Sequence, residues 1–213
     1  MSLDWLGVSE IDFRNLLLLE RDQISWLPGW VPEGPLSVAL KANHCVAWYL
    51  GKKCPGIELW VEHVLAKTKQ LPSPEAVRKA EEEVMANIIV LLVYVIDPAR
   101  YDRLPFLAWD NQELSGLVDF RNALVVDVGA GTGRLAFVAA QRGARAVFAV
   151  EPVGNLRCYV RQKAIRKGVS NVFPVDGLIK AIPFPDCFVD VCMAGHVFGG
   201  DPGREHAEMV RVT

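Results

Sequence analysis

The stretch VVDVGAGTGRLAF, from Val125 to Phe137, decides the fold that this sequence predicts. Three valines around one acid indicate a buried strand, and three glycines within five positions indicate a tight turn. The residues that follow have the apolar spacing of a helix. A strand, a glycine turn and a helix in this order are typical of a cradle for a nucleotide-type cofactor.

Around this stretch, short β-rich runs alternate with helical runs from Ala123 onward. The runs are ALVVDV, RLAFVAAQRG, AVFAVE, NLRCYVRQKAIRKG, NVFPVD and CFVDVCMAG. Such alternation predicts β-α-β units and a parallel sheet, whose strands are apolar because both faces are covered. We predict a Rossmann-like open parallel α/β domain over residues 111–213.

The residues before this domain form helical patterns separated by proline and glycine. Two patterns run roughly over residues 36–50 and 57–69. The clearest helix begins at Ser73, an N-cap residue followed by a proline at the first helical position, and it stops before Pro98. We predict a mainly helical N-terminal region over residues 1–110.

The composition excludes several classes of protein. The chain has 213 residues, is 51% hydrophobic and 23% charged, and is therefore typical of a folded globular protein. A net charge of -2 gives no overall field for a polyanion, so no nucleic-acid partner is expected. Five cysteines without a C-x-x-C pair predict free thiols and no metal site. No apolar stretch reaches the ~20 residues of a membrane span, and we expect a cytoplasmic protein.

The glycine spacing narrows the choice of cofactor. A G-x-G-x-x-G dinucleotide fingerprint would need a glycine where this chain has Arg134, and the lysine of a P-loop is absent. Acids end three successive predicted strands, at Asp127, Glu151 and Asp176. Glu151 follows the turn at close to the ~20-residue offset where an acid meets ribose hydroxyls. Three acids at one sheet edge would repel the negative charge of a pyrophosphate and attract an amino group. They therefore suit an adenosine derivative that carries an amine better than one that carries a pyrophosphate.

With these residues, the segment from about Ala123 to Thr213 resembles the class I S-adenosylmethionine-dependent methyltransferases of the small-molecule, "type 11" group. The resemblance is carried by VVDVGAGTGRLAF, by AVEP, by VDGLIKAIPFPDCFVDV and by EMVRV. It implies that the turn holds the methionine end of the cofactor, the second acid the ribose and the third acid the adenine. The cofactor-binding residues so implied are Asp127, Gly129, Ala130, Gly131, Gly133, Glu151, Pro152, Asp176 and Gly177.

One spacing departs from the family pattern. In many relatives a proline follows the third acid by five residues, whereas Pro183 follows Asp176 by seven here. The extra length could change which group touches adenine, and Gly177 could matter as much as the acid because it lets the backbone come close.

Methyl transfer from a sulfonium is an in-line displacement that needs alignment and exclusion of water rather than many catalytic side chains. His196, in MAGHVFGG, is a candidate base, with strand capping or pocket filling as the alternative. Tyr101 is a second candidate, in a segment that also contains Phe106 and Trp109, and packing of that segment is its alternative. In similar enzymes the helical segment before the first strand often covers the active site, so region 1–110 is expected to select the acceptor.

Two further features carry expectations. The basic residues after Glu151 are expected to form a solvated helix face rather than a nucleic-acid patch; they are Arg157, Arg161, Lys163, Arg166 and Lys167. The chain stops at EMVRVT, where similar enzymes continue into three more strands. We expect a fragment with the fourth strand as an exposed edge, unless the N-terminal region or a second copy in a homodimer supplies the missing edge.

The sequence therefore predicts an enzyme that transfers a methyl group from S-adenosylmethionine to a small-molecule acceptor and releases S-adenosylhomocysteine. Two alternatives stay open. One is an NAD(P)-dependent oxidoreductase, disfavoured by Arg134 and by the acids that would face a pyrophosphate. The other is a non-catalytic module that binds S-adenosylmethionine without turnover.

Overall fold

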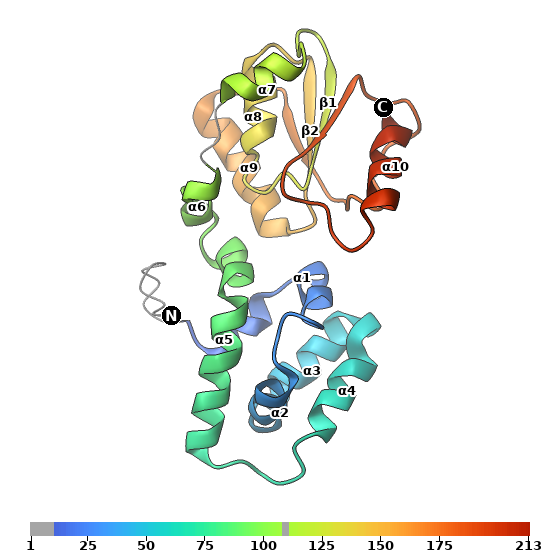
Figure 1. The fold of residues 1–213 in the computed structure, drawn as a ribbon. Coiled ribbons are helices and arrows are strands. Elements are labelled where there is room, and N and C mark those ends of the chain that lie inside the picture. The colour runs from blue at the N-terminus through green and yellow to red at the C-terminus, as the bar shows by residue number, and fades with distance from the viewer. Residues whose placement is uncertain (1–10, 108–110) are drawn as a thin grey trace. The chain divides into compact units, whose positions relative to one another are not determined.

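The structure is a computed structural model that describes residues 11–107 and 111–213. The chain divides into two compact units, Met1–Ile96 and Asp97–Thr213, and each is described by itself (Figure 1). The division comes earlier than the predicted boundary at residue 110, because the short helix α6, Pro98–Tyr101, contacts helix α9 of the α/β unit. Trp109, named with Tyr101 in the sequence, lies outside the described residues.

The first unit is helical. Its elements are η2 (Phe13–Leu18), α1 (Arg21–Trp26), α2 (Glu33–Ala42), α3 (His44–Lys53), η3 (Pro55–Ile57), α4 (Glu58–Ala66) and α5 (Pro74–Ile96). Helix α5 has the predicted limits, and the Ser73 hydroxyl accepts a hydrogen bond from the Ala76 N–H at 3.3 Å. Leu36 and Leu40 of α2 and Leu92 of α5 are fully buried, so the two helices share one apolar core.

The single helix predicted over residues 36–50 is wrong, because Asn43 divides it into α2 and α3. The Asn43 backbone leaves the helical region, with φ -114° and ψ 68°. Its side-chain amide donates to the carbonyl of Ala39 at 2.9 Å and to the carboxylate of Glu81 at 2.6 Å. An asparagine that bonds to nearby backbone offers the chain an alternative to the helix, which the apolar spacing alone did not reveal.

The second unit contains the parallel sheet. Its elements are α6 (Pro98–Tyr101), η4 (Pro105–Leu107), α7 (Asn111–Leu117), β1 (Leu124–Val128), α8 (Arg134–Gln141), β2 (Ala146–Val150), α9 (Gly154–Lys167), β3 (Val172–Val175), β4 (Val191–Ala194) and α10 (Pro202–Val212). The strand order is β3-β2-β1-β4, and every pair is parallel. The four predicted strands and the α/β fold are therefore confirmed, with β4 as the outer strand beside β1.

Helices cover both faces of this sheet, as the uniformly apolar strands predicted (Figure 1). Val125 and Val147 pack on one face with apolar residues of α8 and α9. Val126 and Val150 pack on the other face with Val212 of α10. Alternate residues of one strand point to opposite faces, so a single run of valines supplies both layers of the core.

Candidate cofactor site at the glycine turn

The glycine turn, residues 129–133, follows β1 at the point where the strand order reverses. Strand β2 lies on one side of β1 and β4 on the other, and the chain leaves β1 between them. In open parallel sheets, ligands bind in the crevice outside the carboxyl ends of the strands at this point. The topology therefore puts the predicted cradle where the fold offers a binding crevice.

The turn needs glycine because its backbone is left-handed. Gly129, Gly131 and Gly133 have φ values of 65°, 55° and 77°, which residues with a Cβ rarely adopt. The N–H groups of Gly129 and Ala130 both donate to the carbonyl of Val150, at 2.8 and 3.0 Å. The turn is thus bonded to the end of β2 and held at the edge of the sheet.

Glu151 connects this turn to the residues after β2. Its carboxylate is buried, with one oxygen accepting from the Gly131 N–H at 2.9 Å and the other from the Val153 N–H at 3.0 Å. A carboxylate oxygen can accept more than one hydrogen bond. Each oxygen of Glu151 can therefore accept a hydroxyl as well, which is the chemistry that two vicinal ribose hydroxyls require.

Asp127 lies deeper, at the carboxyl end of β1. It is 1% exposed, and its Oδ2 accepts from the Ala136 N–H at 2.9 Å. Burial raises the pKa of Asp127 to about 7, with a smaller upward contribution from the charge of Glu151 and against the lowering effect of the Ala136 bond. The acid thus links β1 to the first turn of α8 and titrates near neutral pH.

Asp176 follows β3 and is exposed, with one partner in Arg157 of α9. The Arg157 Nη1 donates to Asp176 Oδ1 at 2.9 Å and to the carbonyls of Glu151 and Pro152 at 2.7 Å each. Only 24% of the Arg157 side chain is exposed. The expectation of a solvated face is wrong for Arg157, which ties the ends of β2 and β3 together.

The unusual spacing after Asp176 is taken up by a small turn. Leu178 and Ala181 form an isolated bridge, and the Ala181 N–H donates to the carbonyl of Leu178 at 3.0 Å. Beyond it, Pro183 packs against Gly177, where an added Cβ would lie 2.7 Å from the proline Cδ. The two extra residues therefore let Pro183 return to the residue that follows the acid.

Two other segments flank the glycine turn. A Cβ on Gly131 would lie 3.5 Å from Cε1 of Tyr101, so the ring of the predicted tyrosine stands beside the turn. A Cβ on Gly129 would overlap Val197, in the loop after β4. His196 precedes that valine and is exposed, with a left-handed φ of 56°. Both candidate catalytic residues therefore lie on segments next to the turn, and their roles stay predictions.

Two contacts near the turn were missed by the sequence reasoning. Glu205 of α10 is buried, and its carboxylate accepts from the Gly199 N–H at 2.8 Å, which ties down the loop after β4. Asp102 pairs with Lys163 across a long sequence separation. Lys163 was expected on a solvated face, which is wrong because its side chain is 12% exposed. No local pattern signals either contact, since each partner lies on a different element.

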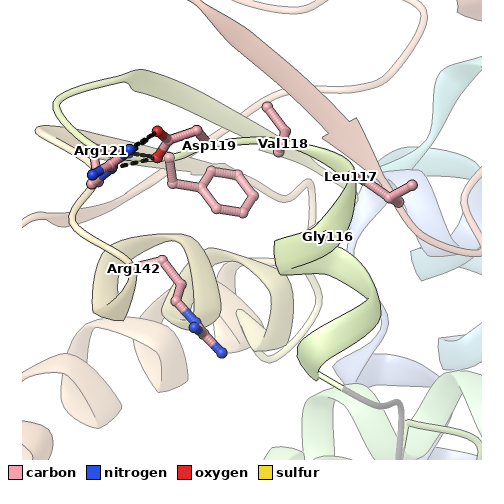
Figure 2. A pocket seen from close by; sticks show the side chains of 7 residues that line it. Gly116, Leu117, Val118, Asp119, Arg121 and Arg142 are labelled. Carbon is pink, nitrogen blue, oxygen red and sulfur yellow. Dashed lines mark hydrogen bonds and ion pairs between the residues drawn. The ribbon is translucent and has the colours of Figure 1, made fainter.

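A hollow of about 510 Å³ lies elsewhere in the α/β unit, lined by residues 116–121 and Arg142 (Figure 2). Its residues precede β1 and follow α8, whereas the glycine turn follows β1. The hollow is therefore at the amino ends of the strands, away from the turn. Its two arginines include Arg121, which is paired with Asp119 at 2.6 Å.

Comparison with known proteins agrees with this geometry. Residues 125–213 match the family described as "Methyltransferase domain". This segment is a methyltransferase domain. The match begins in β1 and includes the glycine turn, so the class I S-adenosylmethionine-dependent methyltransferase domain predicted from the sequence is confirmed.

The individual relatives match only in part. The histone-arginine methyltransferase CARMER of Aedes aegypti is 38% identical over 77 residues, which are 36% of this chain and 13% of the relative. The chain is similar to a solved S-adenosylmethionine-dependent methyltransferase of Aquifex aeolicus with 23% identity and a TM-score of 0.44, over 55% of this chain and 67% of that one. A Haemonchus contortus phosphoethanolamine N-methyltransferase in complex with S-adenosylhomocysteine has 26% identity and a TM-score of 0.37, over 41% and 18% of the chains.

Two kinds of feature are absent from the described residues. Within residues 11–107 and 111–213, no helix is long and apolar enough to cross a membrane. In the same described part of the chain, no group of three or more histidine, cysteine, aspartate or glutamate side chains is arranged to hold a metal ion.

Proposed function

We propose that the methyltransferase domain of this chain binds S-adenosylmethionine at the glycine turn and transfers its methyl group to a small-molecule acceptor. The observation that carries the proposal is the bond between the Glu151 carboxylate and the Gly131 N–H, which joins a ribose-type acid to the turn itself. A glycine turn held in this way has a carboxylate next to it. The residues present fit the cofactor.

The cofactor supplies an activated methyl group on a positively charged sulfur, and the chain has to orient it. Because Gly131 has no Cβ, the ring of Tyr101 can stand close to the backbone of the turn. Glu151 would hold the ribose, and Asp127 would attract the amino group of the methionine end. Asp176, fixed by Arg157, and Gly177 would border the adenine. These roles follow the family resemblance and the positions of the side chains.

The acceptor would enter between the two segments that flank the turn. Tyr101 stands beside Gly131, and Val197 covers Gly129. Such apolar and aromatic surroundings exclude water from a displacement reaction, which favours alignment over acid–base chemistry. His196, exposed on the same loop as Val197, would take a proton from an amine or hydroxyl acceptor.

A peptide arginine is the second candidate acceptor, and the similarity to CARMER favours it. A guanidinium is held best by carboxylates, which pair with it through two hydrogen bonds. The loop from Gly195 to Gly200 has none. The acids that follow it, Asp201 and Glu205, already accept from the N–H groups of Arg204 and Gly199. This loop therefore supports a small acceptor over a guanidinium.

Calorimetric titration of the purified chain with S-adenosylhomocysteine, and with NAD as the comparison, tests the cofactor. We expect saturable binding of S-adenosylhomocysteine and none of NAD. Binding of NAD alone would replace the proposal with the oxidoreductase alternative. If the folded chain binds neither compound, the proposed cofactor site is wrong.

The acceptor class is tested separately with S-adenosylmethionine labelled in its methyl group. The chain is incubated with a small-molecule extract or with a histone peptide, and the label is followed in each. We expect label in the small-molecule fraction. Label on peptide arginine would favour the second candidate, and cofactor binding without any transfer would favour the non-catalytic module.

A further inference from the structure

Four polar side chains meet against the glycine turn, from three separate segments of the α/β unit. The Lys163 Nζ lies 2.8 Å from both carboxylate oxygens of Asp102. The Tyr159 hydroxyl donates to the same carboxylate at 3.0 Å, and the Thr132 side chain is bonded to it as well. Lys163 also donates to the backbone carbonyl of Thr132, inside the turn, at 3.2 Å. We call the Asp102–Lys163 pair the latch.

The latch is sheltered from water. The side chains of Lys163 and Asp102 are 12% and 21% exposed, the lowest combined exposure of any ion pair in the described residues. The Lys163 ammonium also lies 5.2 Å from the ring centre of Phe137 and 5.7 Å from that of Tyr159. A sheltered pair is screened less by solvent than a surface pair, so its geometry is better defined.

Burial disfavours the charge of both partners, but their hydrogen bonds offset this effect to different extents. Burial opposes the charge of Asp102, but hydrogen bonds from Lys163, Thr132 and Tyr159 outweigh it and hold the pKa of this carboxyl below its usual range. Burial lowers the pKa of Lys163, and the bond to Asp102 offsets that shift only in part. Because of this desolvation cost, a buried ion pair contributes little to the stability of the fold. We therefore consider which parts of the structure the pair positions.

The latch positions two parts of the cofactor site. Asp102 is the residue after Tyr101, so fixing its carboxylate fixes the end of α6 and the tyrosine ring beside Gly131. Lys163 holds the turn from the other side through the carbonyl of Thr132. The same ion pair therefore sets the spacing between the ring of Tyr101 and the backbone of the turn.

We propose that the Asp102–Lys163 latch is a positioning device that sets Tyr101 against the glycine turn and thereby determines the affinity for the methionine end of S-adenosylmethionine. The proposal rests on the proposed function of the turn. Neither latch residue needs to touch the cofactor. The latch acts through Tyr101 and through the Thr132 carbonyl, and its loss removes this constraint on both.

The test compares two variants of the latch with a matched surface variant. Asp102→Asn and Lys163→Met remove one charge each, and we expect either to weaken the binding of S-adenosylhomocysteine about tenfold. The control is Arg121→Met, which removes the exposed pair with Asp119 in the same unit, and its affinity should match that of the unchanged chain. Near-constant affinity in both latch variants would overturn the proposal.

A double-mutant cycle separates positioning from a purely structural role. If the latch acts through the tyrosine, Asp102→Asn added to Tyr101→Ala should cost clearly less affinity than Asp102→Asn alone. Fully additive losses would mean that the latch does not act through Tyr101. If Lys163→Met does not fold, Lys163→Arg keeps the charge with a different reach, and an affinity equal to the unchanged chain would count against positioning.

Titration of the unchanged chain distinguishes failure of the latch proposal from failure of the proposed function. If it does not bind S-adenosylhomocysteine, the proposed function fails. If it binds and the latch variants bind equally well, the function stands and the latch proposal fails. Thermal unfolding of each variant accompanies the titrations, because a structural role alone would lower the melting temperature and leave the affinity of the folded fraction unchanged.

Discussion

The two units bury polar side chains in different ways. In the described part of the helical unit, the buried polar residues are Gln23 and Ser37, both uncharged, and Gln23 donates to the carbonyl of Leu91 at 2.8 Å. In the α/β unit they include three acids, Asp127, Glu151 and Glu205. The interior of the helical unit is apolar apart from uncharged groups, whereas the interior of the α/β unit includes acidic side chains, two of them beside the glycine turn.

This difference indicates where the chain gives up stability for function. Burying a carboxylate is costly unless hydrogen bonds satisfy it, and groups with shifted pKa values concentrate at functional sites. Asp127 and Glu151 each accept from a backbone N–H next to or within the glycine turn. The charged interior is therefore what the proposed site needs, and variants can test whether the two interiors act separately.

The largest effect is expected from Gly131→Val. A β-branched side chain is strained at the φ of 55° found there, and its Cβ would stand 3.5 Å from the Tyr101 ring. The methyl groups of the valine would push the ring of Tyr101 away from the turn. Calorimetry should show S-adenosylhomocysteine affinity reduced by about a thousandfold or more, at least about 4 kcal/mol, while circular dichroism still shows a folded chain. Retained binding would mean that the turn is not the cradle.

The second prediction concerns the other interior. Leu92 is fully buried in α5, so Leu92→Ala should reduce the free energy of unfolding of the helical unit by about 2–5 kcal/mol, measured by denaturant titration. The affinity of the folded chain for S-adenosylhomocysteine should not change, because every proposed cofactor contact lies in the α/β unit. A matching loss of affinity would contradict the separation of the two interiors.

The sequence predicted the parts of the site that depend on local pattern. The glycine turn, the four strands and the acids at their ends follow from residue spacing, because the carboxyl ends of parallel strands meet at one edge. The structure accordingly brings Glu151 to the N–H of Gly131. It could not be foreseen that Glu151 also holds the turn, since spacing shows which residues are neighbours but not which backbone groups they satisfy.

Most of the missed features include a contact between distant segments. Asp102 and Lys163 belong to different elements, and nothing near either residue signals the pair. Arg157 reads as one of several basic residues on a helix, yet its guanidinium binds two carbonyls and Asp176. Asn43 ends a helix partly through Glu81, far along the chain. The spacing of residues in the sequence does not identify the tertiary partners of long side chains. These positioning contacts could therefore be found only in the structure.

A smaller effect is expected from Glu151→Gln. A glutamine has one carbonyl oxygen, so it can accept from the N–H of Gly131 or of Val153 but not from both in the way that the carboxylate does. It also loses the charge that strengthens bonds to ribose hydroxyls. Calorimetry should show S-adenosylhomocysteine binding weakened by about tenfold to a hundredfold. Glu208→Gln, far from the turn in sequence, is the matched control and should bind normally.

The smallest effect is a dependence of affinity on pH, carried by Asp127. The pKa of this acid is raised from 3.8 to about 7 by burial, so its favourable contribution to stability is complete below pH 3.8 and is lost as the pH rises through about 7. The ammonium group of S-adenosylhomocysteine would prefer the ionised acid. Affinity should therefore increase about tenfold between pH 6 and pH 8, since one unit below its pKa only about a tenth of the acid is ionised.

Asp127→Asn separates this effect from other titrating groups. The asparagine keeps the shape of the side chain and can still accept from the Ala136 N–H, but it carries no charge at any pH. Its affinity for S-adenosylhomocysteine should be flat between pH 6 and pH 8, and its stability relative to the unchanged chain should rise between about pH 3.8 and pH 7. If the pH dependence survives this substitution, Asp127 does not cause it. The buried acid of the α/β unit would then serve only the packing of α8, in the same way that the uncharged buried residues serve the packing of the helical unit.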